Sequence, residues 1–167
     1  MTHSSKASNP NTETNEFGPH LMLDCRGCDA SKIGDVQAVF NFLYELPNRI
    51  GMTKITQPYV FPYSGLVPED KGVTGMVIIA ESHLTFHSFT EKDYFFFDLF
   101  SCKPFDTDIV TQYVVEYFGV TSFERHEKSR GLDFPRSEFE PVRIPDPVIE
   151  PVSLAQPAKK RVKALSR

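Results

Sequence analysis

The stretch Met76-Val77-Ile78-Ile79-Ala80-Glu81-Ser82-His83-Leu84-Thr85-Phe86-His87 decides the fold of this chain. It overlaps two segments rich in apolar and β-branched residues, Val73–Ala80 and Leu84–Phe89, which predict two strands. A third strand is expected at Tyr94–Ser101, after a turn at Thr90–Asp93. Because the connections are short, consecutive strands should pair antiparallel, as in hairpins.

The same stretch carries residues that are able to do chemistry. Ser82, His83 and His87 lie near the ends of the predicted strands, and Cys102 follows the third strand. A nucleophile, a base and a thiol fit three alternatives: a hydrolase site, a self-cleavage site that forms a pyruvoyl group, or unrelated strand residues. The hydrolase is the weakest of these, because no nucleophile-elbow or oxyanion-hole motif surrounds Ser82.

A strand and a helix are expected before this region. His20–Asp24 predicts a short strand, and Asp29 is a good N-cap for the helix that follows. Pro47 should end or kink that helix near Leu46, and Gly51 should close the segment. The predicted core-facing stripe has three- and four-residue spacing and consists of Ile33, Val36, Val39, Phe40 and Leu43.

A second helix is expected after the third strand. Asp106 or Thr107 should cap it and Gly119 should end it. Its apolar face consists of Ile109, Val110, Tyr113, Val114 and Tyr117. Val120–Arg125 then predicts a further strand, whereas Met52–Tyr63, interrupted by two prolines, suits an edge strand or an irregular segment. The order of elements predicts an α+β fold, a two-layer sandwich of an antiparallel sheet with two main helices on one face.

Composition predicts one folded domain with two extensions. The 167 residues are 40% hydrophobic and 24% charged, which is ordinary for a globular protein. We expect a disordered tail at 1–17, the domain at 18–130, and a Pro-rich and basic extension at 131–167. No apolar run approaches the ~20 residues of a membrane helix, and the N-terminus lacks the apolar centre of a secretory signal. A cytoplasmic protein with no membrane partner is expected.

Charge and cysteine content further restrict the partners and metal sites that we expect for this chain. All 22 acidic residues precede Gln156, and five of the 18 basic residues follow it. The acidic body argues against nucleic acid as a partner and suits a cationic substrate. Cys25-Arg26-Gly27-Cys28 has redox or half-zinc spacing, but no second pair of ligands accompanies it. We therefore expect no metal site and interpret the motif as a strand-to-helix turn.

The motifs resemble, in order and spacing, the prokaryotic S-adenosylmethionine decarboxylases. The resemblance covers roughly residues 18–130. It rests on Ala80-Glu81-Ser82-His83-Leu84-Thr85-Phe86-His87, Glu91, Tyr94, Asp98-Leu99-Phe100-Ser101-Cys102, Gly72-Val73-Thr74-Gly75, His20-Leu21-Met22-Leu23-Asp24 and Gly27-Cys28-Asp29.

The resemblance implies a self-cleaving zymogen. The hydroxyl of Ser82 would attack the carbonyl of Glu81, and elimination from the resulting ester would leave a pyruvoyl group as the only cofactor. The products would be a β chain of residues 1–81 and an α chain that begins at former Ser82. The pyruvoyl group would form a Schiff base with S-adenosylmethionine and accept the electrons released as CO₂ departs. The implied function is decarboxylation in polyamine, specifically spermidine, biosynthesis by a homodimer whose sheets pack together.

The resemblance also implies individual roles. His87 would remove the proton during self-processing, and Cys102 would be the proton donor in catalysis. Thr74 falls where the family usually has a processing serine and keeps its hydroxyl. Glu91 would bind the substrate ribose, and the aromatic candidates for the substrate site include Phe61 and Phe89.

Two questions stay open at this point. Ser82 and His87 are five residues apart, so on one regular strand they point to opposite faces. They converge only if the chain bends or bulges, or if Ser82 precedes the regular strand. The same pyruvoyl machinery also suits arginine or ornithine, and a non-catalytic activator subunit of another decarboxylase is a further alternative.

Overall fold

A six-stranded sheet forms one layer of the protein. The computed structural model describes residues 16–135. The strand order is β2-β3-β4-β5-β1-β6, and every neighbouring pair is antiparallel. The strands are β1 (Gly18–Arg26), β2 (Tyr59–Ser64), β3 (Lys71–Ile79), β4 (Ser82–Phe89), β5 (Tyr94–Ser101) and β6 (Ser122–Arg130). The predicted central strands and the edge strand before them are confirmed, and the last strand is longer than predicted.

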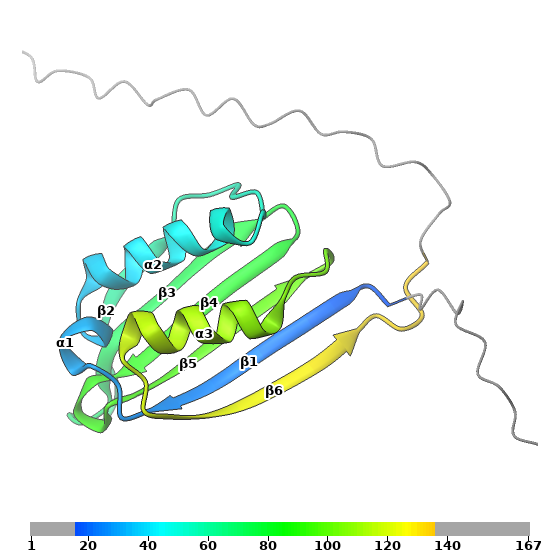
Figure 1. Cartoon of the computed structure of the whole chain (residues 1–167). Coiled ribbons are helices and arrows are strands. Elements are labelled where there is room, and N and C mark those ends of the chain that lie inside the picture. Colours follow the sequence, from blue (N-terminus) through cyan, green and yellow to red (C-terminus); the bar gives the residue numbers. More distant parts are fainter. Residues whose placement is uncertain (1–15, 136–167) are drawn as a thin grey trace, which may run out of the picture.

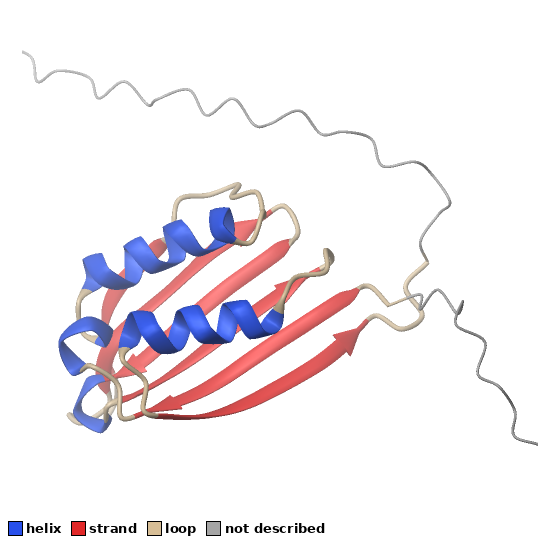
Figure 2. Ribbon diagram, viewed as in Figure 1, coloured by secondary structure: helices blue, strands red, loops and turns tan. Residues whose placement is uncertain are grey.

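The helices form the second layer, all on one face of the sheet (Figures 1 and 2). They are α1 (Ala30–Ile33), α2 (Val36–Arg49), α3 (Thr107–Phe118) and the short 3-10 helix η1 (Thr90–Lys92). This arrangement confirms the predicted α+β sandwich. No helix among residues 16–135 has both the length and the apolar content needed to cross a membrane.

The two faces of the sheet differ in burial. Side chains alternate along each strand, and in β4 the buried positions are Leu84, Phe86 and Ser88. These residues lie on the helix side, where an aromatic cluster fills the space between the layers. Its fully buried phenylalanines are Phe42, Phe86, Phe95, Phe97 and Phe118. The opposite face, which we call the open face, has no helix over it in the described part of the chain.

The first predicted helix is two helices. Asp29 caps α1 and accepts a hydrogen bond from the Ser31 N–H at 3.0 Å, as predicted. The chain then breaks at Gly34, and Asp35 caps α2 by accepting from the Ala38 N–H at 2.7 Å. Because α2 begins anew at this second cap, its buried face differs from the predicted stripe. The buried residues of α2 are Val39, Phe42, Leu43, Leu46 and Pro47. Val36 is therefore exposed and Phe40 only half-buried, contrary to the predicted stripe.

Pro47 does not end its helix near Leu46, because α2 continues to Arg49, so this part of the prediction was wrong. The proline lies in the last turn of α2, where it removes one backbone hydrogen bond and only two helical residues follow it. The Ile50 N–H donates to the Leu46 carbonyl at 3.2 Å, and the Met52 N–H donates to the Pro47 carbonyl at 2.8 Å. Gly51 closes the segment with φ of 67°, as expected.

The second predicted helix is confirmed with a different buried face. Asp106 caps α3, and Gly119 ends it in the left-handed conformation with φ of 63°. Ile109, predicted to face the core, is 58% exposed, because its position on the helix points away from the sheet. The buried residues of α3 are Val110, Thr111, Val114 and Phe118.

The boundaries of the domain are only partly described. Phe17 already belongs to the folded part, since its N–H donates to the Arg130 carbonyl at 2.8 Å. At the other end, the Phe134 N–H donates to the Gly131 carbonyl at 3.0 Å. The greater part of the predicted N-terminal tail and of the C-terminal extension lies outside the described residues.

Candidate active site

Glu81 and Ser82 lie at a tight hairpin turn between β3 and β4. Ile79 pairs with Ser82, so only Ala80 and Glu81 form the turn. Ser82 has φ of 154°, a backbone conformation that residues with a side chain rarely adopt. Such strain costs on the order of 1–3 kcal/mol and persists only where the surrounding structure holds it. The peptide bond that the sequence marks for cleavage therefore joins a turn to a strained residue.

The carbonyl of Glu81 accepts a hydrogen bond from the residue after β5. Ser82 pairs with Ser101, which brings the backbone N–H of Cys102 to 2.9 Å from the Glu81 oxygen. A backbone donor in this position polarises the carbonyl and suits a negative charge that develops on its oxygen. The structure thus brings together Ser82 and Cys102, two of the predicted catalytic residues.

A second contact fixes the turn from its other side. The carboxylate of Glu81 accepts from the Thr53 N–H at 3.1 Å, and the Ala80 N–H donates to the Thr53 carbonyl at 2.8 Å. The sequence suggested no role for the Glu81 side chain, and nothing in it singles out Thr53. These contacts anchor the hairpin to the segment that follows α2.

His83 is the histidine that lies beside the serine. Its Nδ1 is 3.0 Å from the Ser82 Oγ. The imidazole also lies against the ring of Phe100, with the two centroids 6.0 Å apart. We call Glu81, Ser82, His83 and Cys102 the Ser82 cluster. The sequence predicted for His83 packing or a local hydrogen bond, and the contact with Ser82 is such a local hydrogen bond.

His87 lies in a different environment at the other end of β4. Its Nδ1 is 2.8 Å from the hydroxyl of Thr74, its partner across β3. The rings of Tyr63 and Phe89 lie with centroids 4.9 and 4.8 Å from that of His87. Burial lowers the pKa of His87 below its usual value of 6.5. We call Thr74, His87, Tyr63 and Phe89 the His87 cluster.

The predicted substrate residues lie near the His87 cluster. Phe61 stands opposite Thr74 in the sheet and is 54% exposed. Glu91 lies in η1 directly after β4, and its carboxylate forms an ion pair with the ammonium of Lys71 at 2.6 Å. Lys71 begins β3, and the sequence did not suggest it as a partner of Glu91.

The two clusters are separated within one chain. Ser82 and His87 lie on the same strand, and five residues at the rise of a strand place them ~16 Å apart. No bend or bulge brings them together, since the register of β4 with β5 is continuous from Ser82 to Phe89. Ser82 and His87 therefore do not converge within one chain.

Polar and aromatic side chains connect the clusters along the open face. Thr85 donates to the Asp98 carboxylate at 3.2 Å, and the His20 Nε2 is 3.5 Å from the same carboxylate. Burial lowers the pKa of His20, which the nearby Asp98 partly offsets. The exposed large apolar and aromatic residues on this face include Tyr59, Phe61, Met76 and Phe96.

The Cys25-Arg26-Gly27-Cys28 motif forms a structural turn between β1 and α1. Cys25 and Cys28 are buried around Gly27, which has φ of 60°, so the predicted strand-to-helix turn is confirmed. Burial raises the pKa of both thiols to about 12, which disfavours the thiolate needed for redox or metal chemistry. Elsewhere in residues 16–135, Asp24, Glu124 and His126 form a partly exposed group with ligand atoms within 4.8 Å of one another.

Comparisons with known proteins agree on one family. The family described as S-adenosylmethionine decarboxylase matches residues 19–131. A protein of Pyrococcus horikoshii named S-adenosylmethionine decarboxylase proenzyme is 31% identical over 118 residues, covering 70% of this chain and 81% of the relative. A protein of the same name from Anoxybacillus flavithermus is 31% identical over 116 residues, covering 70% and 89%.

A solved structure shares the fold. The crystal structure of the adenosylmethionine decarboxylase from Aquifex aeolicus superposes with a TM-score of 0.59 at 22% sequence identity. The match covers 74% of this chain and 96% of that one.

Proposed function

The chain belongs to the S-adenosylmethionine decarboxylase family, and we propose that the Glu81–Ser82 bond is its self-cleavage site. The protein is a carboxy-lyase of polyamine biosynthesis that is made as a proenzyme and depends on a pyruvoyl group formed by self-cleavage. Its substrate is S-adenosylmethionine, and neither arginine, ornithine nor a non-catalytic role is favoured. All the candidate residues lie within the matched segment.

The observation that carries the cleavage proposal is the contact between the Cys102 N–H and the Glu81 carbonyl. In the proposed reaction the Ser82 Oγ attacks the Glu81 carbonyl carbon, and the carbonyl oxygen becomes negatively charged. The Cys102 N–H, 2.9 Å from that oxygen, stabilises this charge. Breaking the peptide bond also releases the backbone strain at Ser82, which favours the forward direction.

The residues around Ser82 fit a pyruvoyl group at this position. The group forms from atoms of Ser82, and its carbonyl serves as the electron acceptor when the substrate loses CO₂. The side chain of Cys102 begins beside the same turn, since its backbone N–H contacts the Glu81 carbonyl. We assign to Cys102 the protonation of the substrate α-carbon after CO₂ has left.

The His87 cluster suits the rest of the substrate. S-adenosylmethionine carries a sulfonium cation, an adenine and a ribose, which need aromatic faces and a hydrogen-bond acceptor. Phe61, Tyr63 and Phe89 supply the aromatic faces, and the Glu91 carboxylate supplies the acceptor. We also assign to His87, with Thr74 as its hydrogen-bond partner, the removal of the Ser82 α-proton during processing.

These assignments require two copies of the chain. The Ser82 cluster and the His87 cluster lie at opposite ends of β4, yet one reaction needs both. A two-fold axis that lies between two open faces and crosses β4 at right angles would bring each Ser82 cluster to the partner's His87 cluster. The exposed Tyr59, Phe61, Met76 and Phe96 on this face support such packing. We therefore propose a homodimer with two shared active sites.

Mass measurement tests the cleavage site. The wild-type protein should yield one chain of residues 1–81 and one that begins with a pyruvoyl group in place of Ser82. Ser82→Ala should remain a single uncut chain, and the exposed Ser122→Ala serves as the matched control that cuts normally. Release of CO₂ should occur with S-adenosylmethionine and not with arginine or ornithine. An uncut wild-type protein that still decarboxylates would refute the proposed site.

A further inference from the structure

We propose that His83 is the base that accepts the hydroxyl proton of Ser82 in the first step of self-cleavage. This inference rests on the proposed cleavage at Glu81–Ser82 and adds a catalytic residue to it. It gives the two histidines of the stretch separate steps, His83 the formation of the ester and His87 the elimination that follows.

The contact that carries the inference is between the reacting oxygen and a ring nitrogen. The Ser82 Oγ is 3.0 Å from the His83 Nδ1, which is within hydrogen-bond reach for a general base. When the hydroxyl donates to Nδ1, the ring proton of the neutral imidazole is on Nε2. Both residues are half-buried, so the contact is partly shielded from water.

The aromatic surroundings hold the imidazole in place. Phe100 is 9% exposed and lies across the strand pair from His83. Its ring contacts the imidazole edge to face and lies with its centroid 5.5 Å from the ring of His20. The guanidinium of Arg130 covers Phe100 at 4.0 Å from its centroid. A packed neighbour limits the rotation of the His83 side chain and keeps Nδ1 near Ser82.

Ester formation at Ser82 needs no group other than Ser82, Glu81, His83 and the Cys102 N–H. The Oγ–H proton moves to the His83 Nδ1 while the bond from Oγ to the Glu81 carbonyl carbon forms, and the negative oxygen is held by the Cys102 N–H. The carbon–nitrogen bond then breaks as His83 returns the proton to the leaving nitrogen. The products are an ester between Glu81 and Ser82 and a free α-amine on Ser82. His83 ends neutral, as it began.

His87 cannot perform this step within its own chain. It lies ~16 Å from Ser82 by the rise of the strand, and its Nδ1 is occupied by the Thr74 hydroxyl at 2.8 Å. In the proposed dimer the partner's His87 reaches Ser82 for the elimination. The two steps can therefore be separated experimentally, because loss of His87 should leave the ester formed and unprocessed.

The test uses hydroxylamine, which cleaves esters and leaves peptide bonds of the folded protein intact under mild conditions. Four full-length variants are compared with wild type: His83→Ala, His83→Gln, His87→Ala and the control His126→Ala, which changes an exposed histidine of β6. Each is incubated with and without hydroxylamine, and the fragments are measured by intact mass. Thermal melting confirms that each variant is folded.

We expect His83→Ala and His83→Gln to form the ester ~10²–10⁴-fold more slowly, as for loss of a positioned general base. Neither should give a hydroxylamine fragment at times when His87→Ala does. Added imidazole should restore cleavage to His83→Ala, an effect that a purely structural role would not produce. Wild-type cleavage rates in His83→Ala, or accumulation of its ester, would overturn the inference. An uncut wild type would instead contradict the proposed cleavage itself.

Discussion

Cys102 brings two chemical groups to the site, and the proposed mechanism uses them at different stages. Its backbone N–H contacts the carbonyl of the bond to be cut, at 2.9 Å from the Glu81 oxygen. Its thiol is the group assigned to catalysis after cleavage. Because any residue other than proline keeps the N–H, a side-chain substitution separates the two stages.

Cys102→Ala should therefore self-cleave and yet turn over slowly. The backbone donor stays, so cleavage should give the same two chains as in wild type, with the α chain lighter only by the sulfur that the substitution removes. The rate of CO₂ release should fall by ~10²–10⁴, the usual cost of losing a general acid. Full turnover in this variant would remove the thiol from the mechanism. Failure to cleave would show that the side chain also supports processing.

The half-buried imidazole of His87 should set the pH range of the elimination step that we assign to it. Burial lowers its pKa below 6.5, and a proton acceptor has to be neutral to act. The neutral form therefore persists to more acidic pH than for an exposed histidine. The rate of elimination, followed as the loss of the hydroxylamine-sensitive ester, should be level at pH 7 and fall only as the pH drops through this lowered pKa. A rate that already declines between pH 8 and 7 would contradict the assignment of the base to His87.

At the scale of elements, the strands were easier to predict than the helices. Alternating burial on β4 leaves a two-residue period in the sequence, and the short hairpins fix the antiparallel pairing. The break at Gly34 was missed because Ile33 and Val36 continue a helical spacing across it. The expected end of α2 at Pro47 differs from the structure by one short segment, since the helix continues only two residues past the proline.

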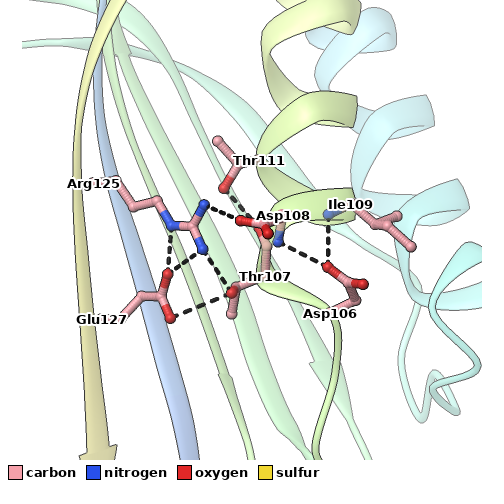
Figure 3. Close-up of polar contacts among 7 residues, drawn as sticks. All are labelled: Asp106, Thr107, Asp108, Ile109, Thr111, Arg125 and Glu127. Atoms are coloured by element: carbon pink, nitrogen blue, oxygen red, sulfur yellow. Dashed lines mark hydrogen bonds and ion pairs between the residues drawn. The ribbon is translucent and has the colours of Figure 1, made fainter.

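A network of ion pairs and hydrogen bonds connects the edge strand β6 to the start of α3 (Figure 3). Arg125 donates to the Asp108 carboxylate at 2.5 Å and to the Thr107 hydroxyl at 2.7 Å, and it also pairs with Glu127. Asp106 caps the same helix through the Ile109 N–H at 3.0 Å. The network therefore joins the outer strand to the helical layer.

Arg125→Ala should lower the free energy of unfolding by about 1 kcal/mol, because a partly buried guanidinium loses three partners at once, although the Asp108 and Glu127 carboxylates are exposed. Denaturant titration measures this as a lower midpoint with an unchanged slope. Arg125→Lys should recover only part of the loss, since lysine lacks the planar fork that contacts three partners. Self-cleavage should persist in both variants, because Arg125 contacts neither cluster. A stability equal to wild type in Arg125→Ala would contradict this account.

At the scale of the whole molecule, the sequence predicted the candidate site residues but not their arrangement in space. Ser82, Cys102, Thr74 and His87 were each recognisable from their motifs. Their division into two clusters follows from the length and regularity of β4, which spacing alone does not establish. In the proposed dimer the clusters meet through a second chain, and the spacing of residues in one sequence does not specify that geometry.

The shared site is the central claim, and complementation between two inactive variants tests it most directly. Ser82→Ala has no cleavable serine, and His87→Ala lacks the base for the elimination, so each should stay unprocessed alone. When the two are co-expressed with tags of different mass, a mixed dimer pairs an intact Ser82 with the partner's intact His87. The account predicts that the His87→Ala chain alone is then cut and that CO₂ release from S-adenosylmethionine returns. Both chains uncut in purified mixed dimers would contradict a site built from two chains.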